Sequence, residues 1–282
     1  MAVGAGVCSR RGTSGGGAWL LFRGDAQIAR VATGSTVAVV AVRGGRVAVA
    51  HGMRVDVYAV DGAEAAREAR GRHGAPPRAA GANGAPRAAT GGVVLCASHM
   101  CAARALAWDD ALTAGTGAGA VVLVDENEAL CVRPCAVSAL AADTGCIAVG
   151  FADGTVCWIA QHPHRLRGPC GESVLAVALE HGMLAATCRR AVDVWFGFAH
   201  MARVPTAARP SALCFADGLL WVGVGSRGRL ELWDGARCVG ALEGHGGAVT
   251  GVALDAAGRV VSTSVTRDGR ALWRSRAPGR LV

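Results

Sequence analysis

Short apolar runs alternate with turns of Gly, Asp and Arg along most of this chain. In six places an apolar run, such a turn and a second alternating run follow one another, which is typical of a hairpin of two β-strands. Glycine and β-branched residues recur inside the apolar runs, so helices are disfavoured there. The six hairpins are expected within residues 45–58, 110–124, 145–159, 182–195, 218–233 and 258–273. A seventh, weaker copy ends at Phe22.

The second strands of these seven copies end at regular steps of 36, 66, 35, 36, 38 and 40 residues. Five of the six steps lie near the ~40–45 residues of one four-stranded propeller blade. Further short apolar runs, such as 238–242 and 248–254, supply the remaining strands of each unit. One unit cannot bury both of its faces alone, so neighbouring units must stack radially. The pattern predicts an all-β fold over 1–282, a β-propeller of about seven four-stranded blades, the first of them incomplete.

The one long step, of 66 residues, contains a segment of different composition. Residues 61–92 are mainly Ala, Gly, Arg and Pro and show no apolar periodicity. Such a composition cannot form a core, so we expect a flexible insertion that follows a third strand.

In the last copy, Trp233-Asp234 closes one strand, Gly244-His245 follows, and Trp273 ends the next hairpin. With these residues, the segment 232–273 resembles a WD repeat. In that family a His, a Ser or Thr, an Asp and a Trp form a hydrogen-bonded set within a blade. The resemblance implies a structural role for such a set in this chain, and a more degenerate copy around residues 98–124 offers a second histidine. The residues concerned are His245, Ser262 or Ser264, Asp268 and Trp273, together with Trp233, Asp234 and His99.

Composition narrows the chemistry further. All 29 basic residues are Arg, so a phosphate-loop, Schiff-base or kinase lysine is excluded. No apolar stretch approaches the ~18 residues of a membrane helix, and the start lacks a secretory signal. The eleven cysteines are therefore expected to be reduced thiols in an intracellular protein of the cytoplasm or nucleus. The basic, acid-free start also fits an organellar presequence.

No catalytic or metal-binding spacing occurs in the sequence, so we expect a non-catalytic protein without cofactor or metal. The interpretation we favour is a scaffold that binds protein partners through its loops. Arginines cluster in the predicted turns between second and third strands, where they would hold the carboxylates of a partner's acidic face. These candidate binding residues are Arg189, Arg190, Arg227, Arg229, Arg267 and Arg270. The alternative is that these arginines bind RNA or anionic lipid.

Overall fold

The computed structural model describes residues 10–11, 17–23, 26–43, 45–60, 93–160, 163–166, 172–225, 228–254, 260–265 and 271–276. All regular elements within these ranges are β-strands. The predicted insertion at 61–92 lies outside them, so its flexibility stays a prediction. The chain divides into two compact units, Met1–Ala103 and Arg104–Val282, which are described separately.

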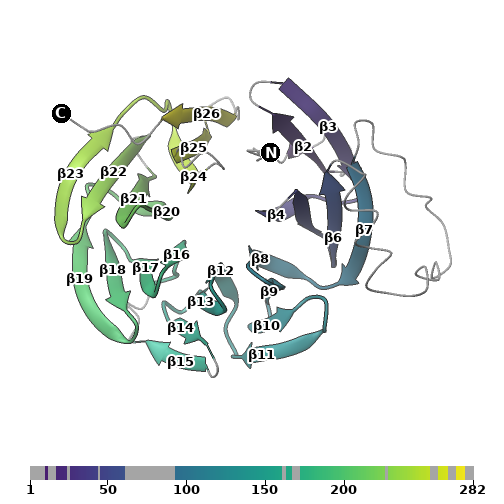
Figure 1. Ribbon diagram of the computed structural model, residues 1–282, viewed down its shortest axis with the longest axis horizontal. Coiled ribbons are helices and arrows are strands. Elements are labelled where there is room, and N and C mark those ends of the chain that lie inside the picture. Colours follow the sequence, from purple (N-terminus) through teal and green to yellow (C-terminus); the bar gives the residue numbers. More distant parts are fainter. Residues whose placement is uncertain are drawn as a thin grey trace. The chain divides into compact units, whose positions relative to one another are not determined.

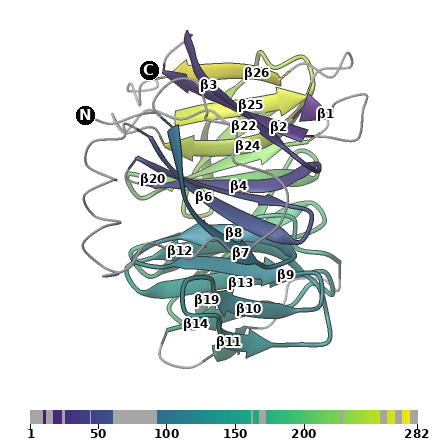
Figure 2. The same cartoon turned by 90° about the vertical axis from the view of Figure 1, so that its right-hand side faces the viewer.

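The first unit holds two antiparallel sheets (Figure 2). The described part of its first sheet has three strands, which are β1 (Arg10–Arg11), β2 (Gly17–Arg23) and β3 (Ala26–Thr33). Its second sheet has four, which are β4 (Val37–Arg43), β5 (Arg46–His51), β6 (Arg54–Val60) and β7 (Val93–Met100). Valines and alanines from both sheets form one core with Tyr58.

The second unit holds five sheets in chain order, each built by antiparallel pairing of consecutive strands (Figure 1). The first sheet comprises β8 (Ala103–Trp108), β9 (Leu112–Thr116), β10 (Ala120–Leu123) and β11 (Glu128–Val132). The second comprises β12 (Val137–Asp143), β13 (Cys146–Phe151), β14 (Val156–Ile159) and β15 (Pro163–Leu166). The third sheet comprises β16 (Val177–Glu180), β17 (Met183–Thr187), β18 (Ala191–Phe196) and β19 (Ala199–Pro205). The fourth comprises β20 (Pro210–Ala216), β21 (Leu219–Val224), β22 (Arg229–Asp234) and β23 (Arg237–Leu242). The last comprises β24 (Ala248–Leu254), β25 (Val260–Val265) and β26 (Ala271–Arg276).

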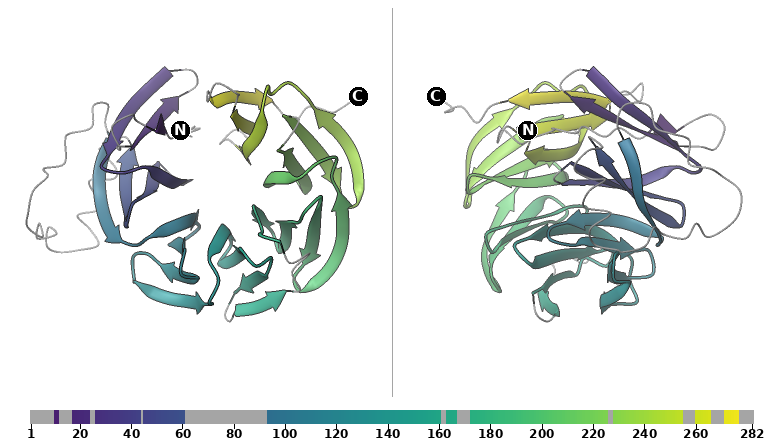
Figure 3. Two further views of the ribbon diagram at one scale, coloured as in Figure 1. Left: turned by 180° about the vertical axis from the view of Figure 1, so that it is seen from behind. Right: turned by 45° about the vertical axis from the view of Figure 1, so that its right-hand side comes forward.

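Burial explains why the second and third strands gave the clearest sequence pattern. Strand β18, for example, is buried at five of its six positions, because both faces of its sheet are covered. The fourth strands lie on the outside of the second unit's sheets and are largely exposed, as β19 and β23 show (Figure 3). Strands buried on both faces read as continuous apolar runs, whereas outer strands do not.

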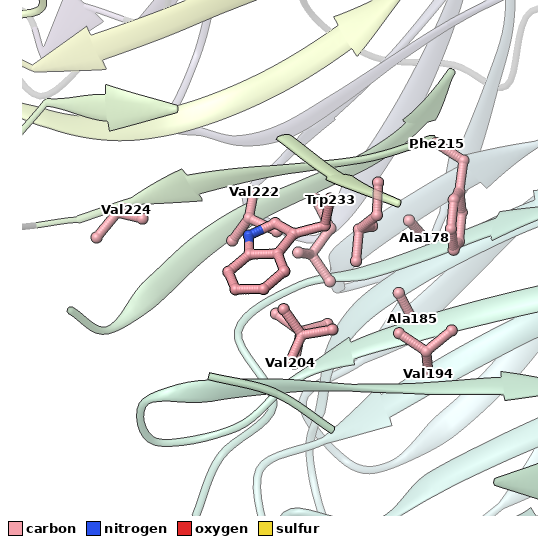
Figure 4. Packing of buried hydrophobic residues seen from close by; sticks show 11 residues of the cluster. Ala178, Ala185, Val194, Val204, Phe215, Val222, Val224 and Trp233 are labelled. Carbon is pink, nitrogen blue, oxygen red and sulfur yellow. The ribbon is translucent and has the colours of Figure 1, made fainter. Parts of the chain in front are cut away.

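Glycines on second strands let consecutive sheets approach closely. A methyl group added to Gly115, Gly150 or Gly223 would lie 2.3, 2.5 or 2.6 Å from a valine Cγ1 atom of the following sheet or the loop before it. The three valines are Val137, Val174 and Val249. The boundary between the sheet of β16–β19 and the sheet of β20–β23 is filled by apolar side chains: Trp233, Val222 and Phe215 pack with Val194 and Val204 of the preceding sheet (Figure 4).

Turns between first and second strands also repeat their backbone geometry. Thr144-Gly145, His181-Gly182 and Asp217-Gly218 all have positive φ at both residues, which is the geometry of a type I′ hairpin turn. The Asp109 carboxylate accepts a 2.7 Å hydrogen bond from the Gly145 amide, and Asp143 accepts one of 2.7 Å from the His181 amide. These bonds join the first turns of three consecutive sheets on one side of the second unit.

Candidate functional site

The turns between second and third strands lie on one side of the second unit, because neighbouring strands are antiparallel. We call this side the arginine face, after seven arginines with described side chains that lie in or beside these turns. Arg133 donates its amide to the Gly119 carbonyl of one turn, and the Arg209 carbonyl accepts the Gly225 amide of another. Arg203 Nη2 donates a 3.1 Å hydrogen bond to Cys188 Sγ in the turn between β17 and β18. The seven are Arg104, Arg133, Arg189, Arg190, Arg203, Arg209 and Arg229.

Three of the predicted binding arginines fall within the described residues. Arg189 and Arg190 form the exposed turn between β17 and β18, and Arg189 Nε lies 2.9 Å from Glu172 Oε1. Arg229 opens β22 and is half-buried, with Nε 3.6 Å from Glu231 Oε1 and Nη1 3.7 Å from Glu243 Oε1. Arg229 is thus occupied by acids of its own sheet. The other three, Arg227, Arg267 and Arg270, lie outside the described residues.

Further arginines lie on this face that the sequence reasoning did not name. Arg133 is engaged internally: its guanidinium lies 5.1 Å from the Phe151 ring centroid and 3.4 Å from Asp153. Arg104 and Arg209 are exposed, as is Arg190. Among the described residues, no carboxylate lies within ion-pair distance of these last three. Each of these arginines lies in such a turn or beside the start of a first strand. The start of a first strand lies at the same end of the sheet as the turn between second and third strands, which only the strand order shows.

The opposite side of the second unit carries the other turns of each sheet and is acidic. Of the arginines with described side chains in that unit, Arg237 lies on these turns, and the exposed His181 lies on another of them. The carboxylates there are Asp109, Asp110, Asp125, Glu126, Glu128, Asp143, Glu180, Asp217 and Asp234. Carboxylates therefore predominate at one end of the sheets and arginines at the other, where Asp153, Glu172 and Glu243 lie beside three of the arginines.

The last sheet contains part of the hydrogen-bonded set that the WD-repeat resemblance implies. His245 is buried, and its Nε2 atom lies 2.6 Å from Ser262 Oγ. The Ser264 hydroxyl is fully buried and has no hydrogen-bond partner among the described residues. Trp273 lies on β26 opposite Thr263. Asp268 lies outside the described residues.

The remaining residues of the implied set lie elsewhere. Trp233 and Asp234 end strand β22, where the Trp233 indole donates a 3.3 Å hydrogen bond to Glu231 Oε2 and Asp234 is exposed. His99 lies within strand β7 opposite Val55. His99 therefore lies on a fourth strand, whereas His245 lies in the connection between β23 and β24, before the first strand of its sheet.

A larger buried polar set occurs in the first unit, where the sequence reasoning named only His99. His51 Nε2 donates a 2.7 Å hydrogen bond to Asp56 Oδ2, and its Nδ1 lies 3.3 Å from Ser35 Oγ. The Ser98 hydroxyl donates to the other oxygen of Asp56, and Arg54 Nη2 donates to Ser98 Oγ at 2.8 Å. Burial alone would raise the pKa of Asp56. Hydrogen bonds from His51 and Ser98, with the charges of His51 and Arg54, outweigh it and bring this pKa below its ordinary value of 3.8.

Serine, histidine and aspartate are also the residue types of a hydrolase triad, but comparison with the other sheets indicates a structural role. Asp193 and Glu231 occupy the same place on a third strand as Asp56, and all three acids are buried. Asp193 Oδ1 lies 3.2 Å from His200 Nε2, and Glu231 Oε1 accepts the Ala207 amide at 3.3 Å. These three sheets thus satisfy a buried acid at corresponding positions with different partner residues.

Cysteines show one departure from the predicted reduced thiols, because Cys188 is disulfide-bonded. Eight other described cysteines are free. Burial and the Glu180 carboxylate raise the pKa of the Cys214 thiol to about 11, so it is unreactive near neutral pH. Within the described residues, no group of three or more potential ligands could hold a metal ion. No described helix is long and apolar enough to cross a membrane.

Comparison with known proteins identifies the fold. No protein-family model and no curated protein matches the chain. Among solved structures, the WD40 β-propeller domain of Doa1 is 13% identical, with 84% of this chain and 82% of that chain covered and a TM-score of 0.62. Sqt1 of Saccharomyces cerevisiae is 9% identical (97% and 82% covered, TM-score 0.64), and a chain of the mitotic checkpoint complex is 17% identical (84% and 75%, TM-score 0.60).

These likenesses confirm the predicted fold class: the chain is an all-β propeller of the kind found in WD40 domains. Seven sheets were expected and seven are described, the first with three described strands. The last sheet also has three described strands, which the sequence pattern did not indicate. A single domain over 1–282 stays a prediction.

Proposed function

We propose that this chain is a divergent WD-repeat propeller that acts as a non-catalytic scaffold and binds an acidic surface of a partner protein on its arginine face. The observation that carries this proposal is the exposure of Arg104, Arg190 and Arg209 on one side of the second unit, without a described carboxylate at ion-pair distance. Guanidinium groups form bidentate hydrogen bonds with carboxylates, which gives such a face selectivity for acidic partners.

The charge separation within the second unit supports the same interpretation. Carboxylates on the far turns repel an acidic partner, while the arginine face attracts it, so approach from one side is favoured. The buried set of Ser35, His51 and Asp56 in the first unit satisfies polar groups inside a sheet, which supports a structural role for this set. Protein partners are favoured over RNA, because exposed aromatic side chains for base stacking are not found on the described arginine face.

The test is an affinity pull-down with mass spectrometry, using the whole chain and a variant with Arg104, Arg190 and Arg209 changed to Ala. We expect the variant to lose its main protein partners while its circular dichroism spectrum stays unchanged. The matched control is Arg237→Ala, which removes an exposed arginine from the opposite side and should retain the partners. An unchanged partner set in the triple variant contradicts the docking face, and recovery of RNA in place of protein supports the alternative function.

A further inference from the structure

Strand β7 is the outer strand of its sheet, by which we mean the last described strand of a sheet in chain order. It lies at one end of the order β4-β5-β6-β7, and within the described residues no strand pairs with its outer edge (Figure 1). It spans eight residues, as does β3, against seven in β19, six in β23 and in β26, five in β11 and four in β15. A long open edge of this kind pairs readily with another chain unless the protein blocks it.

The composition of β7 separates it from the other outer strands. Proteins usually block an open edge with charged residues or prolines. Strand β7 contains no arginine, no acid and no proline. Each other described outer strand carries at least one of these residues, namely Arg30 in β3, Glu128 in β11, Pro163 and Arg165 in β15, Arg203 and Pro205 in β19, Arg237 in β23 and Arg274 in β26. A bulge interrupts the pairing of β7 with the third strand, but β11, β19 and β23 have one as well.

The backbone of β7 has hydrogen-bonding groups that face away from β6. The Cys101 amide, directly after the strand, donates a 3.0 Å hydrogen bond to the Met53 carbonyl just before β6. Successive residues of an antiparallel strand direct their backbone groups to alternate sides. The backbone groups of His99 therefore face β6, whereas those of Ser98 and Met100 face outward. A further strand can pair with these outward groups.

Two exposed apolar side chains of β7 lie on the same face of the sheet. Leu95 is opposite Tyr58 of β6, and Met100 is opposite Arg54. Tyr58 and Arg54 are four residues apart on β6, and residues at an even spacing along a strand share a face. Leu95 is 39% exposed and Met100 is 75% exposed. Both ends of the edge therefore offer an apolar contact on one face.

A guanidinium group lies between these two apolar side chains. Ser98 is opposite Asp56 and shares their face, and the exposed Arg54 donates from Nε and Nη2 to Ser98 Oγ at 3.2 and 2.8 Å. Within the described residues, no carboxylate lies within ion-pair distance of Arg54. Asp56 is the single acid in residues 34–43, 45–60 and 93–100, and it is buried and bonded to Ser98 and His51. The exposed part of this face is therefore suited to an acidic ligand.

We infer that β7 is a docking site for an extended segment of a partner protein, which adds to the sheet as a fifth strand and carries an acid with an apolar residue two positions before and after it. Backbone hydrogen bonds supply affinity in such strand addition, and side chains supply selectivity. The apolar residues pack on Leu95 and Met100, and the carboxylate approaches the Arg54 guanidinium. A second copy of β7 fits less well, because it offers no acid to Arg54. The site lies in the first unit and does not depend on the arginine face.

The experiment measures binding of a fluorescein-labelled peptide to the whole chain by fluorescence anisotropy. The peptide has a central glutamate with a leucine two positions before and after it, and threonine elsewhere. Leu95→Lys places a charge on the edge, as the other outer strands have, and should weaken binding about tenfold or more. The matched control is Met201→Lys, at a 63% exposed position of the outer strand β19, and it should bind as the unchanged chain does.

A second variant tests the charge without adding one to the edge. Arg54→Gln keeps a donor for Ser98 and removes the positive charge. The unchanged chain should prefer the glutamate peptide about tenfold over a peptide with lysine at its centre, because a charged hydrogen bond is replaced by repulsion. In Arg54→Gln this preference should shrink to less than about threefold. This ratio compares two peptides on one protein, so a change in the folded fraction does not alter it.

A third peptide tests the strand addition itself. With N-methyl groups on alternate amides, the glutamate peptide should bind weakly, because pairing with the edge needs those hydrogen bonds. Equal binding of the N-methyl peptide overturns the site, as does equal binding to Leu95→Lys or an undiminished preference in Arg54→Gln. Binding that appears only after residues 66–87 are deleted would assign the edge to the chain's own segment. A dimer that Leu95→Lys abolishes would assign it to a second copy, and either result overturns the inference.

Discussion

At the scale of single residues, the buried polar groups follow topology more than sequence. His245 and Ser262 join the connection before a first strand to the second strand, and Ser35 and His51 do the same in another sheet. In the last sheet the histidine lies in the connection and the serine on the second strand. In the other sheet the serine lies in the connection and the histidine on the second strand. A search for one motif therefore finds the last sheet and misses the other, although both meet the same need to pair buried polar atoms.

The two buried serines of the last sheet should respond differently to substitution. Ser262→Ala leaves His245 Nε2 without its 2.6 Å partner, which should cost about 1–3 kcal/mol of unfolding free energy. Ser264→Ala removes a buried hydroxyl that has no described partner, so stability should change by less than about 0.5 kcal/mol or rise. Urea unfolding followed by tryptophan fluorescence measures both. Equal losses would show that Ser264 also belongs to the hydrogen-bonded set.

The scale of strands shows why some features could be predicted and others could not. Second and third strands are buried on both faces, so their apolar runs and their turns were visible in the sequence. The acids Asp56, Asp193 and Glu231 were missed because a single acid inside an apolar run looks like a solvent-facing position of an alternating strand. The signal was present, however, in the recurring form of residues 54–58, 191–195 and 229–233, where an acid lies two residues before an aromatic.

Strand-to-strand packing between sheets can be tested at Gly150. A methyl group there would lie 2.5 Å from Val174 Cγ1, so Gly150→Ala should destabilise the second unit by about 1–3 kcal/mol through overpacking. Val174→Ala removes the nearest clashing atom, Cγ1, and leaves Val174 Cβ at 2.9 Å, so the clash is partly relieved and the double variant should be more stable than the sum of the single losses predicts. Chemical denaturation of the four proteins completes this cycle.

Gly225 offers a matched control for that cycle. A methyl group at Gly225 would meet nothing nearer than the Arg209 carbonyl oxygen at 3.4 Å, so Gly225→Ala should change stability little. Additive losses at Gly150 and Val174 would mean that the sheets separate to admit the methyl group. The close approach would then not be a constraint on this boundary.

For the whole chain, the two units differ in the spectroscopic probes they contain. Tyr58 is the single tyrosine of the sequence and lies in the first unit, 3.4 Å from the Asp56 carboxylate through its hydroxyl. Six of the seven tryptophans lie in the second unit. Tyrosine absorbance therefore reports on the first unit, and tryptophan fluorescence reports mainly on the second, which allows their stabilities to be compared in one molecule.

Acid should weaken the first unit through Asp56. The pKa of this carboxyl is lower in the folded chain than its ordinary value of 3.8, so its ionised form stabilises the fold above about pH 4, and this stabilisation is lost as the pH falls through the folded pKa. The denaturant midpoint reported by Tyr58 should fall as the pH is lowered from about 5 to about 2.

In Asp56→Asn this midpoint should be lower at neutral pH, because His51 loses its charged partner, and it should depend less on pH. The tryptophan midpoint of the same variant serves as the internal control and should match that of the unchanged chain. An undiminished pH dependence of the Tyr58 signal in Asp56→Asn would mean that other carboxylates govern the acid stability of this unit.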